Sequence, residues 1–218
     1  MDEMDRNMKD CLKNIPGYIN YLCRGYYVPR ELHEAMKTGE DLILHLSDTP
    51  SNAYRSVINL VKILKPRIII HTGDLADDIK LELHPDLAHL YREKALPFLR
   101  ELENSAAEEI YIVPGNHDLG GLLEEEAGRS RIVPDGTVIE IRGLKVGLAH
   151  CQEDLPRSAD YKLYGHNLDC PVDGNPCTLN GCRDINIILY PSWRNYCIPY
   201  PVGTNYDRQY NLLSGRLL

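Results

Sequence analysis

Apolar runs alternate with amphipathic segments in the first half of the chain. Three short apolar runs have the length and the β-branched content of buried strands, and they span 41–47, 67–72 and 111–114. Residues 51–64 carry apolar side chains at helical spacing, and 87–102 is a second such segment that contains Pro97. This β-α-β-α-β order predicts neighbouring parallel strands that are joined by right-handed crossovers.

The pattern changes after Gly120. Residues 132–141 and 144–150 are predicted as two antiparallel strands around the Arg142-Gly143 turn. Further short strands are expected at 161–164 and 184–189. Between these two lies 169–183, which is rich in Cys, Pro, Gly and Asn and is predicted to be a loop.

The two ends of the chain differ from its middle. Residues 1–40 are predicted to be an N-terminal helical extension that packs on the core, with a helix that starts near Pro29 and stops at Gly39. Residues 41–218 are expected to form the main domain, and its tail is rich in Tyr and Pro. Aromatic and Arg side chains of that tail, such as Trp193 and Arg208, could form a substrate wall or the contact of a homodimer. Aromatic tails pack as core or interface more often than they bind a ligand, so packing is favoured over substrate contact.

Composition narrows the class of protein. The chain has 218 residues, of which 43% are hydrophobic and 26% are charged, as in ordinary soluble domains. A net charge of −8 disfavours broad nucleic-acid binding, which normally uses a basic face. We find no apolar run near the roughly 20 residues of a membrane span. The polar start of the chain does not resemble a secretory signal, so we expect a cytoplasmic protein without membrane contact.

The cysteines fit the same interpretation. There are seven, and an odd number in a chain of this length is more typical of reduced thiols than of a disulfide framework. Four of them lie late in the chain, at Cys170, Cys177, Cys182 and Cys197. Because their spacing contains no CxxC pair, buried or incidental thiols are favoured over a structural zinc site.

Polar side chains follow several of the predicted strands. They are Asp48, Gly73-Asp74, Gly115-Asn116-His117-Asp118, Ala149-His150 and Gly165-His166. Open α/β sheets place their chemistry at the carboxyl ends of the strands, and O and N ligands together suit a hard or borderline metal. Taken singly, the two aspartates could be helix N-caps and His150 a core histidine. The complete series favours a metal site.

This series resembles the motifs of the calcineurin-like metallophosphoesterase family over about residues 41–190. The resemblance implies an α/β fold, a four-layer α/β/β/α sandwich of two mixed sheets. It also implies that Asp74 bridges two metal ions, with Asn116, His150 and His166 completing the site of one ion. Asp48 would bind the other ion. His117 would donate a hydrogen bond to the phosphoryl group, and Asp118 would orient it.

The chain departs from the family pattern at the second ion. The family motifs D-x-H and G-H-x-H each contain a histidine that is replaced here, by Pro50 and by Leu168. Neither side chain can bind a metal, so one firmly held divalent ion is expected and the second is left open. The resemblance suggests Mn, Fe, Zn or Ni, and the ligand set does not choose among them.

The resemblance implies a metal-dependent phosphoesterase that attacks a small-molecule phosphoester with metal-activated water. A phosphodiesterase is favoured over a phosphomonoesterase by analogy with compact family members. One alternative is a catalytically weak or inactive binding scaffold, which the lost histidines would suit. A further alternative is a nuclease of the same family, and the acidic charge balance argues against it.

Overall fold

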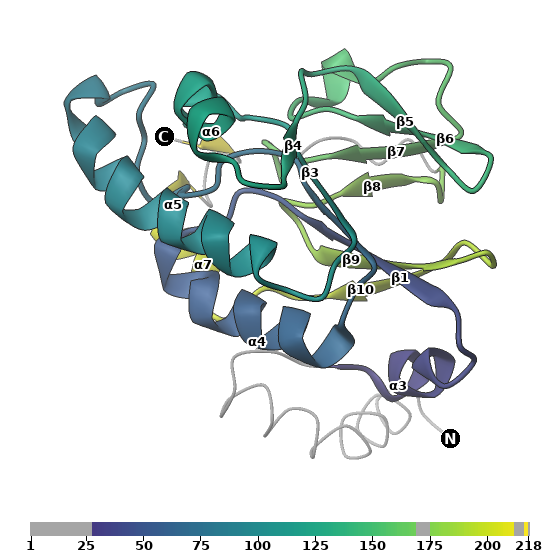
Figure 1. Ribbon diagram of the computed structural model, residues 1–218. Helices are drawn as coiled ribbons and strands as arrows, with labels where there is room; N and C mark the ends of the chain where they lie inside the picture. Colours follow the sequence, from purple (N-terminus) through teal and green to yellow (C-terminus); the bar gives the residue numbers. More distant parts are fainter. Residues whose placement is uncertain (1–27, 169–174, 212–215, 218) are drawn as a thin grey trace, which may run out of the picture.

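A sheet of six strands forms the centre of the protein. A computed structural model describes residues 28–168, 175–211 and 216–217. The strand order of the large sheet is β10-β9-β1-β2-β3-β4 (Figure 1). Its strands are β1 (Asp41–Leu46), β2 (Ile68–His71), β3 (Glu109–Ile112), β4 (Arg131–Ile132), β9 (Ile185–Tyr190) and β10 (Arg194–Ile198). The four strands β1 to β4 pair in parallel, whereas β9 and β10 are antiparallel to their neighbours.

A second sheet of four strands packs against the first. It consists of β5 (Thr137–Ile141), β6 (Leu144–Leu148), β7 (Tyr161–Tyr164) and β8 (Thr178–Asn180). The β5–β6 pair is antiparallel, and the β6–β7 and β7–β8 pairs are parallel. Ile43 and Ile70 of the large sheet share one buried cluster with Val146 and Leu163 of the small sheet. The two mixed sheets therefore pack face to face, with apolar side chains between them.

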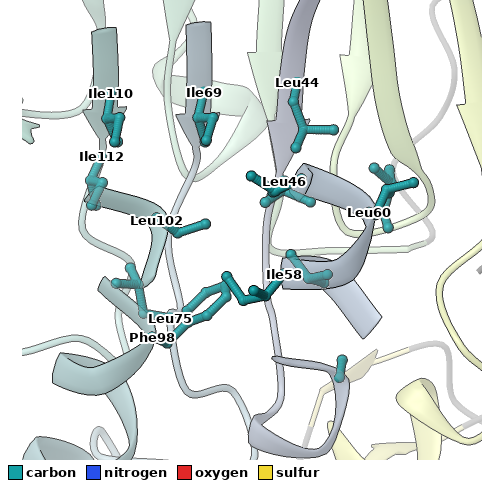
Figure 2. Packing of buried hydrophobic residues seen from close by; sticks show 14 of the residues in the cluster. Leu44, Leu46, Ile58, Leu60, Ile69, Leu75, Phe98, Leu102, Ile110 and Ile112 are labelled. Atoms are coloured by element: carbon teal, nitrogen blue, oxygen red, sulfur yellow. The ribbon is translucent and has the colours of Figure 1, made fainter. Parts of the chain in front are cut away.

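Helices α4 (Tyr54–Leu64) and α5 (Ala88–Glu103) cover the other face of the large sheet. Side chains alternate along β1, so Ile43 enters the core between the sheets while Leu44 and Leu46 contact the helices. In Figure 2, Leu46 lies near Leu60 of α4, and Phe98 of α5 lies beside Leu75. The predicted sandwich of two mixed sheets flanked by helices is confirmed.

The remaining elements are short. They are α3 (Arg30–Met36), α6 (Gly120–Glu126), α7 (Thr204–Asp207), three 3₁₀ turns (Ser51–Ala53, Pro85–Leu87 and Gln152–Asp154) and the pair β11 (Tyr210–Asn211) with β12 (Arg216–Leu217). None of the helices in the described ranges is long and apolar enough to cross a lipid bilayer.

Two sequence predictions were wrong in detail. The single strand expected at 132–141 is two strands, because β4 pairs with β3 in the large sheet while β5 belongs to the small one. Pro134 cannot donate to a ladder, and Gly136 adopts a φ of +75°, so the chain turns between them. The loop expected at 169–183 contains β8, and its residues 169–174 lie outside the described chain.

Most of the expected N-terminal extension also lies outside the described residues. Its described part includes α3, in which Leu32 and Ala35 are buried against the core. Pro29 precedes this helix, and Gly39 follows it with a φ of +78°. The division into 1–40 and 41–218 stays a prediction.

The α4 helix allows a matched test of the core. Leu60 is fully buried, whereas Ile63 of the same helix is 44% exposed. We expect Leu60→Ala to lower the free energy of unfolding by about 2–5 kcal/mol, because it removes buried area and leaves a cavity. Ile63→Ala should stay within roughly 1 kcal/mol. Urea denaturation measures both changes, and similar losses in the two variants would contradict this packing.

Candidate metal centre

Three of the predicted ligands occupy a rare backbone conformation. Asp48, Asp74 and His166 have φ values of +48°, +58° and +66°. Non-glycine residues seldom adopt this left-handed region, and such strain is concentrated at functional sites. The turns are held to each other, because Asp48 N donates to Gly73 O over 2.8 Å and His166 N donates to Asp48 Oδ2 over 2.9 Å.

Glycines allow these turns to approach closely. A Cβ on Gly115 would collide with Oδ1 of Asp74 and would lie 2.7 Å from its backbone nitrogen. A Cβ on Gly165 would collide with the side chains of Ser47 and Asp48. The glycines of GNHD and GH therefore bring the strand ends into contact.

Asp48, Asp74 and His150 form one cluster that could hold a metal ion. Each offers one ligand atom, and these atoms all lie within 4.8 Å of one another. All three side chains are buried. Within the described chain, Asp48 Oδ1 and Asp74 Oδ2 have no hydrogen-bond partner. Buried carboxylate oxygens without a partner are costly, so these residues fit a bound cation.

Asn116 and His166 complete the same cluster. His150 Nδ1 donates to the carbonyl of Thr72 over 2.7 Å, which directs the lone pair of a neutral ring at Nε2 into the cluster. Asn116 Oδ1 lies 2.9 Å from His150 Nε2 and 3.1 Å from His166 Nδ1. The two ring nitrogens are 3.1 Å apart. Three ligand atoms of different strand ends thus face one point.

The buried carboxylates of the cluster favour the presence of a positive charge. Burial, and then the nearby carboxylates of Asp77, Asp118 and Asp48, raise the pKa of Asp74 well above its ordinary value. Burial alone would lower the pKa of His150, but Asp74 and Asp48 raise it to about 9. The pocket therefore stabilises a cation, and a metal ion would compete with the proton on His150.

His117 lies at the edge of this cluster. Its backbone nitrogen donates to Asp74 Oδ1 over 2.9 Å, and its side chain is almost fully buried. Burial, followed by the positive charge of Lys80, lowers the pKa of His117 to about 4, so the ring is neutral. Asn116 Nδ2 lies 3.3 Å from Nε2 of this ring and also donates to the exposed Glu82 over 2.6 Å.

Asp118 has partners other than the predicted one. Sequence reasoning placed it as the residue that orients His117. Its carboxylate accepts hydrogen bonds from the backbone nitrogens of Asp74, Leu75 and Gly115 over 2.7–2.8 Å, and from the hydroxyl of Tyr91. These hydrogen bonds join Asp118 to the turns that carry Asp74 and Asn116, and an orienting role toward His117 stays a prediction.

Sequence reasoning missed a second group that shares Asp74. Asp74, Asp77 and His117 also offer ligand atoms within 4.8 Å of one another. Lys80 is buried and makes an ion pair with Asp77. The spacing Asp74-x-x-Asp77-x-x-Lys80 could have indicated this group, because residues three apart lie on one side of a turn.

Arg208 lies in the core, one of the placements that the sequence favoured for this tail over a substrate wall. It is fully buried rather than part of a substrate wall, and its Nε donates to Asp48 O over 2.6 Å. Nothing in the local sequence points to this contact, since 160 positions separate the two residues.

The other candidates lie away from the centre. His45 and His71 are buried, and their Nε2 atoms lie 2.9 and 3.0 Å from the hydroxyls of Thr72 and Thr49. Cys151, Cys177, Cys182 and Cys197 are free thiols, and the metal-capable groups found within the described chain contain no cysteine. Cys170 lies outside the described residues.

Comparison with known proteins identifies the family. A model of the calcineurin-like phosphoesterase family matches residues 42–188, more than half of the chain. The chain therefore belongs to the calcineurin-like phosphoesterase family. This is a family of metal-dependent phosphoester hydrolases, and the Asp/His clusters described above could hold its metal.

Solved structures show similar but distant folds. An archaeal phosphodiesterase is 19% identical, with 72% of this chain and 98% of that chain covered and a TM-score of 0.49. YfcE, a phosphoesterase from E. coli, is 14% identical over 73% and 99% of the two chains, with a TM-score of 0.43. The nuclease MPE of Pseudomonas putida is 16% identical over 57% and 60%, with a TM-score of 0.35. Likenesses at these values do not define a substrate.

A search of the curated proteins gave no match.

The brace formed by Asp118 can be tested by an isosteric change. Asp118→Asn replaces one acceptor oxygen with an NH₂ group that faces backbone N–H donors. We expect the free energy of unfolding to fall by about 1–3 kcal/mol in metal-free buffer. The exposed Asp86 offers the matched control Asp86→Asn, which should change it by less than about 0.5 kcal/mol. Equal urea midpoints for the two variants would refute the bracing role.

Proposed function

We propose that the protein hydrolyses a phosphodiester with one divalent ion held by Asp74, Asn116, His150 and His166. The observation that carries this proposal is the convergence of Asn116 Oδ1, His150 Nε2 and His166 Nδ1. Asp74 Oδ2 has no hydrogen-bond partner among the described residues and lies 3.5 Å from His150 Nε2. Carboxylate, amide and imidazole ligands suit a divalent transition metal such as manganese. Such an ion, when bound, neutralises phosphoryl charge and makes a water molecule more acidic.

The side chains around the ion have distinct roles in this proposal. Asp48 contributes its unpartnered Oδ1 to the charge of the pocket, but its second site lacks the histidines replaced by Pro50 and Leu168. The neutral ring of His117 carries one N–H, which can donate to a phosphoryl oxygen or to the leaving group. Asp118 keeps the backbone of Asp74 and Gly115 in place.

The negative charge of Glu82 beside the metal centre supports a diester substrate over a monoester. Glu82 is exposed, and its Oε2 accepts from Asn116 Nδ2. A carboxylate next to the ligand Asn116 repels a dianionic monoester more strongly than a monoanionic diester. Glu82 also orients the amide so that Asn116 Oδ1 faces the two histidines.

Removal of one ligand tests the metal assignment. We expect Asn116→Ala to bind Mn²⁺ at least about tenfold more weakly and to lose hydrolysis of bis(4-nitrophenyl) phosphate with it, because one oxygen ligand is gone. Asn104→Ala, at an exposed site after α5, is the matched control and should keep both. Equilibrium dialysis with elemental analysis measures the ion.

Three results would favour other interpretations of this experiment. Full Mn²⁺ retention by Asn116→Ala would contradict the ligand assignment. Metal binding without hydrolysis of any phosphoester would favour a binding scaffold. Cleavage of DNA with an affinity that falls steeply with salt would favour a nuclease.

Substrate charge is tested at Glu82. The change Glu82→Gln keeps an acceptor for Asn116 but removes the negative charge. We expect kcat/KM for 4-nitrophenyl phosphate to rise severalfold, and kcat/KM for the corresponding diester to rise less, because the dianion gains more from the lost repulsion. The exposed Glu125 gives the control Glu125→Gln, which should change neither. An equal gain for both substrates would argue against charge selection by Glu82.

A further inference from the structure

The buried charges of this protein are gathered in one place. Among the described residues, the charged side chains that are buried, apart from histidines, are Asp48, Asp74, Asp77, Lys80 and Arg208. Lys80 has a side chain only 1% exposed, and its Nζ binds Asp77 Oδ1. An ammonium group is placed in a protein interior only where a carboxylate compensates for its lost hydration.

Lys80 lies at the second of the two metal-capable groups. That group consists of Asp74, Asp77 and His117, with ligand atoms within 4.8 Å of one another, and it shares Asp74 with the proposed metal site. Asp74 Oδ2 and Asp77 Oδ2 are buried and lack hydrogen-bond partners in the described parts of the chain. Buried oxygens of this kind favour a nearby cation. Lys80 Nζ binds the other oxygen of Asp77, Arg208 Nε lies 4.0 Å from Asp77 Oδ2, and His150 Nε2 lies 3.5 Å from Asp74 Oδ2.

We propose that the Lys80 ammonium is the resident cation of the Asp74–Asp77–His117 group and takes the place of a second metal ion. This inference rests on the proposed function, because it assumes one ion at Asp74, Asn116, His150 and His166. Lys80 then excludes a further divalent ion by charge repulsion and by occupying Asp77.

The charge balance agrees with a single ion. Four carboxylates meet here, namely the buried Asp48, Asp74 and Asp77 and the partly buried Asp118. Lys80 and Arg208 supply two positive charges. Arg208 is fixed by hydrogen bonds to the carbonyls of Asp48 and Cys182, and its Nε lies 4.0 Å from Asp77 Oδ2. A net charge of two negative charges is left. One divalent ion neutralises it, whereas two divalent ions would give the centre an excess of positive charge.

Metal stoichiometry tests this proposal without any assay of activity. Purified full-length protein is stripped with a chelator, titrated with Mn²⁺ in equilibrium dialysis and analysed for bound metal. We expect one Mn²⁺ per chain in the natural protein and two in Lys80→Met, because Asp77 is freed as a ligand. Electron paramagnetic resonance gives a second readout, since two neighbouring Mn²⁺ ions give a spin-coupled spectrum and one ion does not.

Matched variants distinguish the effect of the Lys80 charge on metal binding from the effect of its side-chain shape. Lys80→Arg keeps the positive charge and should bind one ion. Asp77→Asn combined with Lys80→Met removes both partners and should also bind one, because the second site loses its carboxylate. Lys94→Met, at an exposed lysine of α5, should bind one. Should Lys80→Met fail to fold, Lys80→Gln removes the ammonium charge while keeping a polar side chain, and it is expected to bind two because the charge repulsion is lost.

The outcomes distinguish this inference from the proposed function. Two ions in the natural protein would overturn the role of Lys80 while leaving a phosphoesterase centre intact. One ion in folded Lys80→Met or Lys80→Gln would overturn it as well. No bound ion in the natural protein would overturn the proposed function itself.

Discussion

Neutralisation of buried negative charge is the constraint on which the rest of this structure depends. Asp48, Asp74 and Asp77 are fully buried where the parallel strands end. Burial raises the pKa values of Asp74 and Asp77, so without nearby positive charge these carboxylates would take up protons. The fold therefore surrounds them with backbone N–H groups, two buried cations and imidazole rings.

The C-terminal segment is part of this arrangement, although it lies beyond residue 188, where the family match ends. Arg208 donates to backbone carbonyls of the β1 turn, and its guanidinium stacks over Tyr200 at 4.4 Å. The hydroxyl of Tyr200 donates to Ser47 O over 2.9 Å. These contacts hold Asp48 in its left-handed conformation. The tail therefore packs against the turn that carries Asp48, in line with the packing role that the sequence favoured for it over a substrate wall.

Short-range patterns in the sequence predicted the strands and the site residues that directly follow them. The period of apolar residues located β1, β2 and β3, and the polar residue after each strand identified Asp48, Asp74 and Asn116 as neighbours, because parallel strands end at one edge. Contacts between residues that are far apart in the sequence could not be predicted in this way. Two partners of Asp118 are backbone groups of a different turn, and one partner of Arg208 is 160 positions away. The β4–β5 division depends on which sheet each segment joins.

The lost histidines and the buried lysine are consistent with one physical change. At Pro50 and Leu168 the second metal site lacks two neutral ligands, while its carboxylates Asp48 and Asp74 stay buried. Asp74 is shared with the neighbouring group that contains Asp77, the carboxylate that Lys80 binds. A tethered ammonium supplies one charge where a divalent ion supplies two. Under the two proposals, the centre then carries one positive charge less than a two-metal centre. A phosphodiester likewise carries one negative charge less than a monoester dianion, so the lysine and the diester preference would have the same electrostatic origin.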